Sequence, residues 1–425
     1  MSVPGLAARR AAAALLAGVL DDGLTLAEQA SDAGPLARLA PSERARAQAL
    51  AATTLRHLGR IDALLAGYLQ KRTPSAATNA LRLAAAEVHL DGIAPHAAVD
   101  GAVRLVRGGK GGDRLAGLVN AVARRAAADA AGWQAAAEAP LPAWIAAPVA
   151  AAWGDATLAA IADAHRRLAP LDLTLRRPET AVEWAGRLDA EVLPTGSLRL
   201  RGRPQISALP GYETGDWWVQ DAAAAVPARL LGEVAGRRVL DLCAAPGGKT
   251  LQLAAAGARV TALDLSEPRL ARLRDNLART GLAAEIVAAD ALAWAPEAGF
   301  DAILLDAPCT ATGTIRRHPD LPHVRGGRDV EALTALQRQF LARAWGWLAP
   351  GGRLVTCVCS LLPAEGEDQA ARFRAATPDL RAVRPAAPGL DPSWIDAEGG
   401  LRLRPDYWPE RGGMDGFYVA AFEKS

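Results

Sequence analysis

The second half of the chain alternates short β-rich runs with helical stretches, and this alternation constrains its fold more than any other feature. The clearest helical patterns are at residues 267–280 and 330–348. The β-rich runs are at residues 238–242, 259–263, 285–288, 300–305, 353–358 and 417–422. This order is typical of a doubly wound, mostly parallel sheet, in which ligands bind beyond the carboxyl ends of the strands.

An aspartate stands at or near the end of each of the first four strands. These residues are Asp241, Asp264, Asp290 and Asp306. One such acid would be an ordinary strand-end cap. Four of them along one edge of a parallel sheet, beside a glycine-rich turn, indicate a ligand site instead. Asp264 ends the second strand, where an acid typically binds ribose hydroxyls.

The first strand runs into the turn Asp241-Leu-Cys-Ala-Ala-Pro-Gly-Gly-Lys-Thr250, which opens a helix. Its glycines let a ligand approach the backbone, and a helix N-terminus offers free N–H groups to an anion. The turn is neither a GxGxxG nor a GxxxxGK motif, which disfavours dinucleotides and nucleoside triphosphates. We expect S-adenosyl-L-methionine, with its carboxylate at the turn, its ribose at Asp264 and its adenine beside Asp290. The predicted cofactor residues are Cys243, Ala244, Ala245, Pro246, Gly247, Gly248, Lys249, Asp264, Asp290 and Asp306.

Two cysteines follow the fourth and fifth strands. The chain has four Cys and no CxxC pair, so we expect neither a disulfide scaffold nor a metal site. Cys309 and Cys359 lie just beyond strands that are neighbours in the common order of this cofactor fold, and they should meet beside the methyl donor. Buried core cysteines are the alternative interpretation. We favour that alternative for Cys357, which shares a strand face with Cys359, and its role stays open.

A cysteine beside a methyl donor points to methylation at C5 of a pyrimidine. C5 of cytosine is a poor nucleophile, but a thiolate that adds to C6 pushes electron density to C5, which then attacks the methyl group. A base must remove the C5 proton before the thiolate can leave. Asp306 is placed to assist at the N3 edge of the cytosine. A free thiol has a pKa of ~8.5 and must be activated by its surroundings.

The first 130 residues have a helical pattern, with one apolar stripe formed by leucines and an isoleucine at residues 55–69. Residues 1–145 carry a net charge of +4, and the remainder carries −2. A basic cluster surrounds the glycine-rich loop 108–112 and includes the single acid Asp113. Its members are Arg104, Arg107, Lys110, Arg114, Arg124 and Arg125. It is interpreted as an RNA-backbone contact surface, with a solvated helix face as the alternative.

Between these regions, the proline-rich stretch 140–148 is typical of a linker. Residues 150–215 combine a helix at 157–168 with short strands at 171–176 and 197–201, which predicts a small α/β module. The acidic pair Asp21-Asp22 directly follows the apolar run 11–20 and disfavours a signal peptide. No apolar run suits a membrane helix, so we expect a cytoplasmic protein without membrane contact.

Several motifs together resemble the RNA cytosine-5 methyltransferases, above all the bacterial 16S rRNA enzymes of the Sun/Fmu type. The resemblance covers residues 215–425. It rests on Trp218-Val-Gln-Asp221, the turn from Asp241 to Thr250, Asp306-Ala-Pro-Cys-Thr-Ala-Thr-Gly313, Arg316-Arg-His-Pro-Asp320, Cys359-Ser-Leu-Leu-Pro-Ala-Glu365 and Met414-Asp-Gly-Phe-Tyr418. The N-terminal segment resembles the NusB-type RNA-binding domain, most clearly at Gly117-Leu-Val-Asn-Ala-Val-Ala-Arg-Arg125.

The resemblance implies roles for the two cysteines, with Cys359 as nucleophile and Cys309 assisting release. It also implies ribosomal RNA of the small subunit, free or partly assembled, as substrate. Many relatives have Thr where this chain has Val358, which we do not expect to affect the chemistry. The implied domains are a helical NusB-like domain at 1–138, a linker and small α/β module at 139–215, and a Rossmann-like S-adenosylmethionine-dependent methyltransferase domain at 216–425.

Other interpretations stay open at this point. A non-catalytic RNA-binding assembly factor would need no intact cofactor and cysteine motifs. A methyltransferase of adenine amino groups commonly carries Pro-Pro-aromatic where this chain has Ala307-Pro308-Cys309. Arg316 and Arg317 are predicted to grip RNA phosphate, with a structural ion pair as the alternative.

Overall fold

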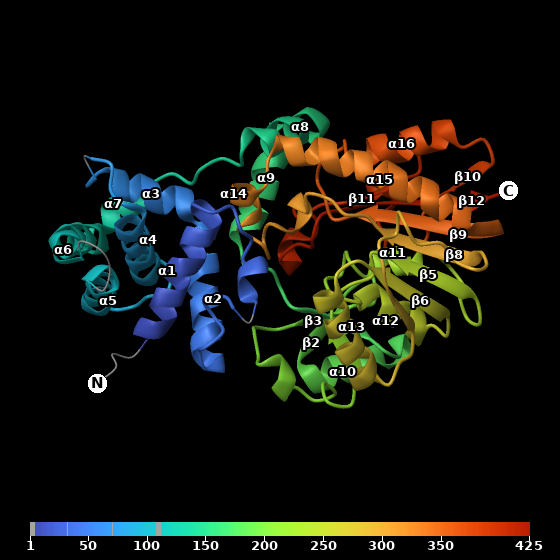
Figure 1. Ribbon diagram of the computed structural model, residues 1–425, viewed down its shortest axis with the longest axis horizontal. Helices are drawn as coiled ribbons and strands as arrows, with labels where there is room; N and C mark the ends of the chain where they lie inside the picture. Colours follow the sequence, from blue (N-terminus) through green and yellow to red (C-terminus); the bar gives the residue numbers. More distant parts are fainter. Residues whose placement is uncertain (1–4, 32, 70, 108–111) are drawn as a thin grey trace. The chain divides into compact units, whose positions relative to one another are not determined.

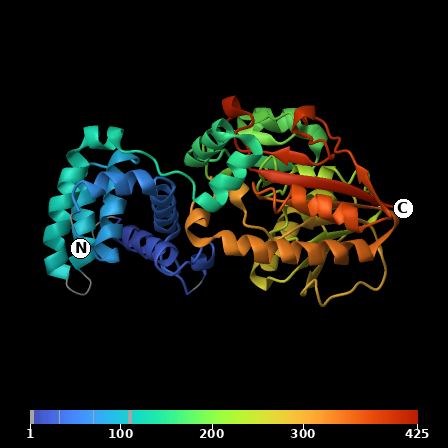
Figure 2. The same ribbon diagram turned by 90° about the horizontal axis from the view of Figure 1, so that it is seen from above.

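The computed structural model describes residues 5–31, 33–69, 71–107 and 112–425. The chain divides into two compact units (Figures 1 and 2). Unit 1 contains Met1–Pro142 and Ile315–Gly326, and unit 2 contains Ala143–Thr314 and Gly327–Ser425. Unit 1 is helical and unit 2 holds both sheets, which confirms the predicted fold class.

The helices of unit 1 pack around a core of alanine and leucine side chains. They are α1 (Leu6–Leu20), α2 (Pro41–Arg56), α3 (Leu58–Ala66), α4 (Ser75–His89), α5 (Pro95–Arg107), α6 (Gly112–Ala128), α7 (Ala130–Ala135) and the short α14 (Leu321–Val324). The single helical stripe predicted at 55–69 is wrong, because α2 ends before His57 and α3 begins after it. The backbone of His57 leaves the helical region, and Ile61, Leu64 and Leu65 still reach the core after this break.

A segment that follows strand β8 in sequence belongs to unit 1, which the sequence did not indicate. In this segment, Ile315–Gly326, the Asp320 carboxylate accepts a hydrogen bond from the backbone N–H of Leu26 at 2.9 Å. Arg56 donates to the backbone carbonyl of Arg316 at 2.9 Å. Val324 packs against the core of the unit. The segment is therefore an integral part of the helical unit.

The middle module of unit 2 is built on a four-stranded antiparallel sheet of order β2-β3-β1-β4. Its elements are α8 (Ala143–Trp153), α9 (Asp155–Arg166), β1 (Asp172–Leu175), α10 (Ala181–Leu188), β2 (Ala190–Val192), β3 (Leu198–Leu200) and β4 (Trp217–Val219). Two details differ from the prediction. Pro148 lies inside α8, so the proline-rich stretch is not a linker throughout. Strand β4 pairs with β1, so the module extends past residue 215.

A buried ion pair lies in this middle sheet. Asp172 on β1 and Arg199 on β3 are 1% and 4% exposed, and two N–O distances of 2.7 Å join their side chains. The same carboxylate accepts the backbone N–H of Ala222 at 3.0 Å, and Arg199 donates to the backbone carbonyl of Arg411 at 2.7 Å. The pair therefore ties the middle sheet to two segments that lie outside it, at Ala222 and Arg411.

The second sheet of unit 2 has eight strands, seven of them in the order β10-β12-β9-β8-β5-β6-β7, with β11 on β12. Strands β9, β8, β5, β6 and β7 are parallel, and β12 pairs with its neighbours antiparallel. The strands are β5 (Arg238–Leu242), β6 (Arg259–Asp264), β7 (Glu285–Ala288), β8 (Phe300–Asp306), β9 (Leu348–Val358), β10 (Leu380–Val383), β11 (Leu401–Leu403) and β12 (Phe417–Lys424). The mostly parallel sheet is thus as predicted.

Helices cover both faces of this sheet (Figure 1). They are α11 (Val226–Arg229), α12 (Gly248–Ala255), α13 (Glu267–Thr280), α15 (Gly327–Trp347) and α16 (Glu367–Ala376). Successive strand residues point to opposite faces, and β8 illustrates the division. Its Leu304 packs in a cluster with residues of α11 and α12, whereas Ile303 packs in a cluster with residues of α15. The carboxyl ends of β5, β6, β8 and β9 meet at one edge and position the candidate site.

Candidate active site

The glycine-rich turn after β5 is fixed against the neighbouring strand β6. The backbone N–H groups of Cys243 and Ala244 both donate to the Leu263 carbonyl, at 2.9 and 3.1 Å. Gly247 has φ +107°, and a Cβ there would overlap the side chain of Leu273, so this position requires glycine. Helix α12 begins at Gly248, and its first N–H groups have no partner within the helix. The turn can therefore hold the carboxylate of S-adenosyl-L-methionine.

Asp264, at the end of β6, is 5% exposed and faces the same turn. Its two carboxylate oxygens accept the backbone N–H groups of Ala245, at 3.0 Å, and Ser266, at 2.8 Å. An ionised carboxylate can accept about four hydrogen bonds, so capacity remains for ribose hydroxyls. The next residue, Leu265, is 74% exposed although it is large and apolar, and it offers a surface for an adenine ring. Sequence reasoning missed Leu265. Asp290, which was predicted to lie beside the adenine, is exposed beyond the end of β7.

Lys249 and Asp306 form an ion pair at the carboxyl ends of β5 and β8, with 2.7 Å between Nζ and Oδ2. Burial alone would lower the pKa of Lys249, but the Asp306 carboxylate outweighs it and raises the pKa. The other oxygen of Asp306 accepts the thiol of Cys357 at 3.4 Å. Cys357 is 1% exposed, and burial raises the pKa of its thiol well above the usual range. Lys249 and Cys357 thus orient Asp306 from two sides.

The structure brings Cys309 and Cys359 together. They follow the parallel neighbours β8 and β9, whose register pairs Asp306 with Cys357, and their sulfur atoms are 3.5 Å apart. Both are free thiols and both are partly exposed. The pKa of Cys309 lies well above its usual range, first because of its hydrogen bond with Cys359 and then because of burial. The proximity expected from the strand order is therefore present.

The motifs Trp218–Asp221 and Met414–Tyr418 are joined by hydrogen bonds to each other and to the segments that carry these cysteines. Gly313 donates its backbone N–H to the carbonyl of Cys359 at 3.0 Å, and Gly416 donates to the carbonyl of Gly313 at 2.8 Å. Asp221 accepts the backbone N–H of Asp415 at 3.1 Å. Motifs that are far apart in the sequence therefore form one hydrogen-bonded structure around the cysteine segments.

Sequence reasoning also missed Glu365, a buried carboxylate beside the two cysteine segments. It is 2% exposed and accepts hydrogen bonds from Thr310 and Ser360, the residues that follow Cys309 and Cys359. The only sequence signal was its position six residues after Cys359.

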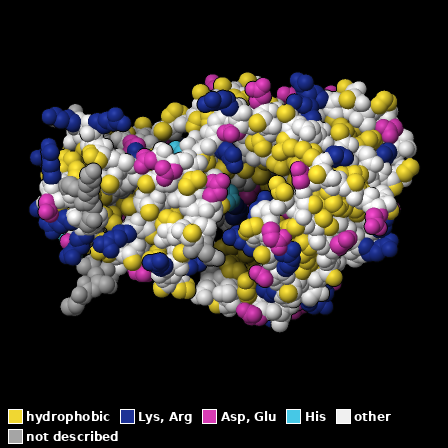
Figure 3. Space-filling view, in the orientation of Figure 1, with side chains coloured by type: hydrophobic (Ala, Val, Ile, Leu, Met, Phe, Trp, Pro, Cys, Tyr) yellow, Lys and Arg dark blue, Asp and Glu magenta, His cyan; other side chains and the backbone are white. Residues whose placement is uncertain are grey.

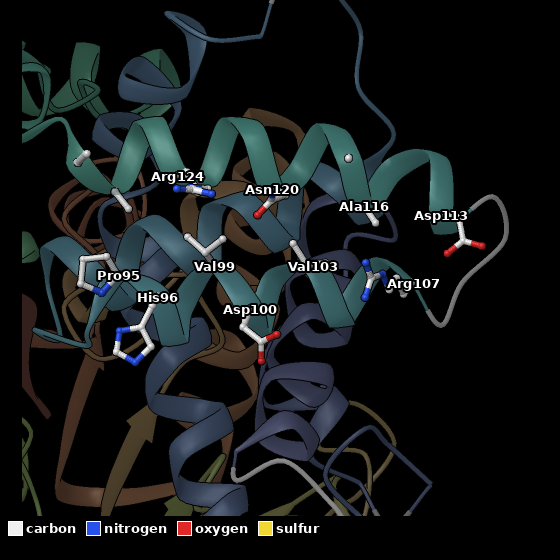
Figure 4. A pocket seen from close by; sticks show the side chains of 13 residues that line it. Pro95, His96, Val99, Asp100, Val103, Arg107, Asp113, Ala116, Asn120 and Arg124 are labelled. Atoms are coloured by element: carbon white, nitrogen blue, oxygen red, sulfur yellow. The ribbon is translucent and has the colours of Figure 1, made fainter.

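The predicted RNA-contacting residues of α5 and α6 lie on the surface of unit 1. Those that the structure describes are exposed: Arg104, Arg107, Arg114, Arg124 and Arg125. Lys110 lies outside the described residues. Lys and Arg side chains, dark blue in Figure 3, gather over these helices at the left of the view. Arg107 and Arg124 line a groove of about 1010 Å³ between α5 and α6, together with His96 and Asn120 (Figure 4).

Arg316 does not fit the predicted phosphate contact. It is 2% exposed, because the segment that carries it packs into unit 1, and its carbonyl is held by Arg56. A guanidinium in this position cannot reach an RNA backbone on the surface, so the structural alternative is favoured. Arg317 is half-buried in the same segment.

Neither a metal-ligand group nor a membrane-spanning helix is found among the residues that the structure describes. No group of three or more His, Cys, Asp or Glu side chains there has the arrangement of a metal site. Within the same residues, every helix is too short or too polar to cross a membrane.

Comparisons with known proteins agree with both parts of this geometry. The family model described as 16S rRNA methyltransferase RsmB/F matches residues 228–423, and the NusB family matches residues 6–128. Ribosomal RNA small subunit methyltransferase B of Xanthomonas campestris pv. campestris is 35% identical, over 99% of this chain and 98% of the relative. The enzyme of the same name from Vibrio cholerae is 34% identical over 98% of this chain and 97% of its own.

A solved structure shares the fold of the catalytic part. The methyltransferase homolog protein of Pyrococcus horikoshii has a TM-score of 0.56 and 28% identity, covering 66% of this chain and 94% of its own. The cradle at Gly247, the acid at Asp264 and the apolar surface at Leu265 fit the predicted methyl donor, S-adenosyl-L-methionine. The chain therefore belongs to the RsmB/F family of 16S rRNA methyltransferases, and it is an S-adenosyl-L-methionine-dependent methyltransferase of ribosomal RNA with a NusB-like domain.

Proposed function

We propose that this enzyme methylates C5 of a cytosine in 16S rRNA through a covalent adduct between Cys359 and C6 of the base. The observation that carries the proposal is the pair of free thiols, 3.5 Å apart, beyond the strand ends next to the cofactor turn. A methyltransferase acting on an amino nitrogen or a hydroxyl has no use for two cysteines at this position. Covalent catalysis at C5 uses both, one to form the adduct and one to end it.

The bond changes that follow ionisation of the Cys359 thiol can be assigned to groups in turn. The thiolate of Cys359 adds to C6, and the π electrons of the C5–C6 bond move toward C5 and N3. Asp306, which Lys249 and Cys357 orient, positions the N3 edge of the base by accepting a hydrogen bond from the cytosine amino group. Bound S-adenosyl-L-methionine supplies the methyl group to C5. Cys309 takes the C5 proton, and that electron pair restores the C5–C6 double bond as the C6–S bond breaks.

The coupling between the two thiols suits this order of events. Four influences raise the pKa of Cys309, in the order of the hydrogen bond with Cys359, burial, the charge of Cys359 and the charge of Glu365. When Cys359 is bonded to C6, its thiolate no longer exists, and the first and third influences vanish. The pKa of Cys309 then falls at the stage at which a base is needed.

The exposed arginines of α5 and α6 would bind the RNA backbone in this proposal. Arg107 and Arg124 line the groove near its two ends (Figure 4), while Arg104 is already paired with Asp100 at 2.7 Å. The target base must leave any stack to reach the thiols. We therefore infer that the substrate is small-subunit RNA in free or partly assembled form, and that the enzyme works in the cytoplasm, where thiols stay reduced.

A comparison of two cysteine variants tests the proposal. Cys359→Ala should abolish transfer of radiolabelled methyl to small-subunit RNA while leaving cofactor affinity unchanged. Cys309→Ala should accumulate an RNA–protein adduct, seen as a shifted band on a denaturing gel, because the C5 proton is not removed.

The double variant is the matched control, since removing Cys359 should also remove the shifted band. Full activity of Cys359→Ala would refute the covalent mechanism. An active Cys309→Ala variant without any adduct would refute the role of Cys309. Mapping 5-methylcytosine in the product RNA would then identify the modified position.

A further inference from the structure

Glu365 occupies a buried position in the turn between β9 and α16, behind the two cysteines. Its carboxylate accepts hydrogen bonds on both oxygens. Oε1 accepts the backbone N–H of Thr310 at 2.9 Å and the side-chain amide of Gln337 at 3.3 Å. Oε2 accepts the hydroxyls of Thr310 and Ser360, each at 2.5 Å. Glu365 is thus a four-fold acceptor in an environment that is closed to water.

The donors belong to the two segments that carry the reactive thiols. Thr310 directly follows Cys309, and Ser360 directly follows Cys359. Gln337 on α15 also donates to the carbonyl of Pro308, which directly precedes Cys309, at 2.9 Å. One carboxylate therefore holds the residue after each cysteine, and its partner Gln337 holds the residue before the first. The two segments also meet directly, since the Thr312 hydroxyl lies 3.1 Å from the Ser360 hydroxyl and accepts the backbone N–H of Leu361 at 2.9 Å, but Glu365 is the buried carboxylate to which both segments donate.

The charge of Glu365 is compensated by these donors and not by a cation. Within the described part of the chain, no Lys or Arg side chain pairs with it. A buried charge without an ion-pair partner depends on every hydrogen bond that it accepts. Hydrogen bonds to an ionised acceptor are short and about twice as strong as neutral ones, so they fix the positions of their donors closely. Burying this carboxylate is costly, and fixed positions for Thr310 and Ser360 are the benefit that would offset the cost.

We propose that Glu365 is a positioning residue for methyl transfer, whose carboxylate sets the separation between the segment of Cys309 and the segment of Cys359 so that both thiols act on one base. The inference rests on the proposed function, because it assigns a reason for holding the two thiols together. Glu365 acts through Thr310 and Ser360 and does not touch the substrate. Its charge also lies close enough to Cys309 to raise the pKa of that thiol.

Glu365→Gln tests this proposal because it keeps the shape and removes one acceptor oxygen. The amide can keep its oxygen toward the N–H groups of Thr310 and Gln337 only if its NH₂ group faces the hydroxyls of Thr310 and Ser360, which must then accept instead of donate and lose the charged acceptor that fixes them. We expect kcat to fall 10- to 100-fold, while the KM for RNA and the Kd for S-adenosyl-L-methionine change less than threefold. Asp368→Asn is the matched control, since Asp368 is exposed three residues further along the chain, and its kcat should stay within twofold of the parent.

A second measurement does not depend on methyl transfer. The rate of alkylation of Cys309 by iodoacetamide, followed by peptide mass spectrometry across a pH series, reports the pKa of this thiol. In Glu365→Gln the profile should move to lower pH, because a neutral amide no longer raises that pKa; in Asp368→Asn it should not move. If Glu365→Gln fails to fold, Thr310→Val removes one hydroxyl donor and should lower kcat about fivefold.

The outcomes separate this proposal from the proposed function. Active Cys359→Ala enzyme overturns the covalent mechanism, whatever Glu365 does. If Cys359 is essential but Glu365→Gln keeps kcat within twofold and an unchanged alkylation profile, the positioning role is wrong. A loss of kcat that is matched by the loss of cofactor affinity would also overturn it, because it would indicate general damage to the fold.

Discussion

Replacing Gly313 with alanine should slow methyl transfer without weakening cofactor binding. Gly313 lies four residues after Cys309, and it is packed against the backbone of Gly416. A Cβ on Gly313 would lie 2.6 Å from the carbonyl carbon of Gly416 and 2.7 Å from its Cα, and would overlap its carbonyl oxygen. Ordinary contacts of a Cβ begin at 3.4 Å, so the two backbones must separate by about 1.3 Å to relieve the overlap with the carbonyl oxygen.

The displacement passes to the nucleophile because Gly313 donates its N–H to the carbonyl of Cys359 at 3.0 Å. A misplacement of about 1 Å in a reacting group can cost roughly 100-fold in rate. We therefore expect kcat to fall 10- to 100-fold. Overpacking also costs about 1–3 kcal/mol, and we expect the free energy of unfolding to fall by that amount. Gly247 packs on Leu273, and Asp264 accepts the backbone N–H groups of Ala245 and Ser266, so we expect the Kd for S-adenosyl-L-methionine to change less than threefold.

Single-turnover transfer of radiolabelled methyl to RNA measures the rate of methyl transfer. Calorimetric titration with the cofactor measures its Kd. Gly346→Ala is the control. Gly346 is inside α15, and nothing lies within 4 Å of a Cβ built on it. That variant should keep its kcat and gain about 0.5–1 kcal/mol of stability, because alanine favours the helix. A Gly313→Ala enzyme with kcat within threefold of the parent would refute the reasoning.

Three further predictions concern stability, pH and RNA binding. Asp172→Ala should cost about 3–5 kcal/mol in urea unfolding because it leaves Arg199 buried without its partner, whereas Asp163→Ala removes an exposed pair and should cost less than about 1 kcal/mol; equal losses would contradict this. Burial raises the pKa of Asp241 to about 7, so the folded protein keeps a proton that the unfolded chain releases. The free energy of unfolding should therefore fall as pH rises from about 4 to 7, and Asp241→Asn should flatten that slope; an unchanged slope would show that Asp241 is not its source. Arg107→Gln combined with Arg124→Gln should weaken RNA binding and reduce the slope of log K against log salt by about 0.7–0.9 per lost phosphate contact, whereas the parent slope would remove both residues from the RNA interface.

Much of the catalytic sheet could be predicted because local patterns determine its elements. The helix at Glu267–Thr280 follows from Leu270, Leu273 and Leu277 at helical spacing, and all three are buried in the structure. The meeting of Cys309 and Cys359 follows from two parallel neighbours with a common edge. These inferences need only periodicity and the usual strand order.

The remaining features depend on contacts between distant parts of the chain, which a single sequence does not reveal. Nothing local indicates that Gly313 packs on Gly416, or that Glu365 accepts hydrogen bonds from both cysteine segments. Arg316 was predicted to be a surface cation because it lies on the loop after the fourth strand, yet its side chain is buried and its segment belongs to unit 1. The predicted middle module ended at residue 215, before β4, because only the pairing of β4 with β1 identifies the place of this strand.

The inclusion of Ile315–Gly326 in the helical unit has a consequence for the timing of synthesis. The chain emerges from the ribosome in order, and the 172 residues 143–314 separate the first part of this unit from its last, which takes roughly 9–34 s at ~5–20 residues per second. During that interval the backbone N–H of Leu26 cannot yet bond to the Asp320 carboxylate. The side chain of Arg56 likewise cannot yet bond to the carbonyl of Arg316. The N-terminal unit is therefore completed only after β5, β6, β7 and β8 have been made, so the order of translation links the maturation of the helical unit to that of the catalytic sheet.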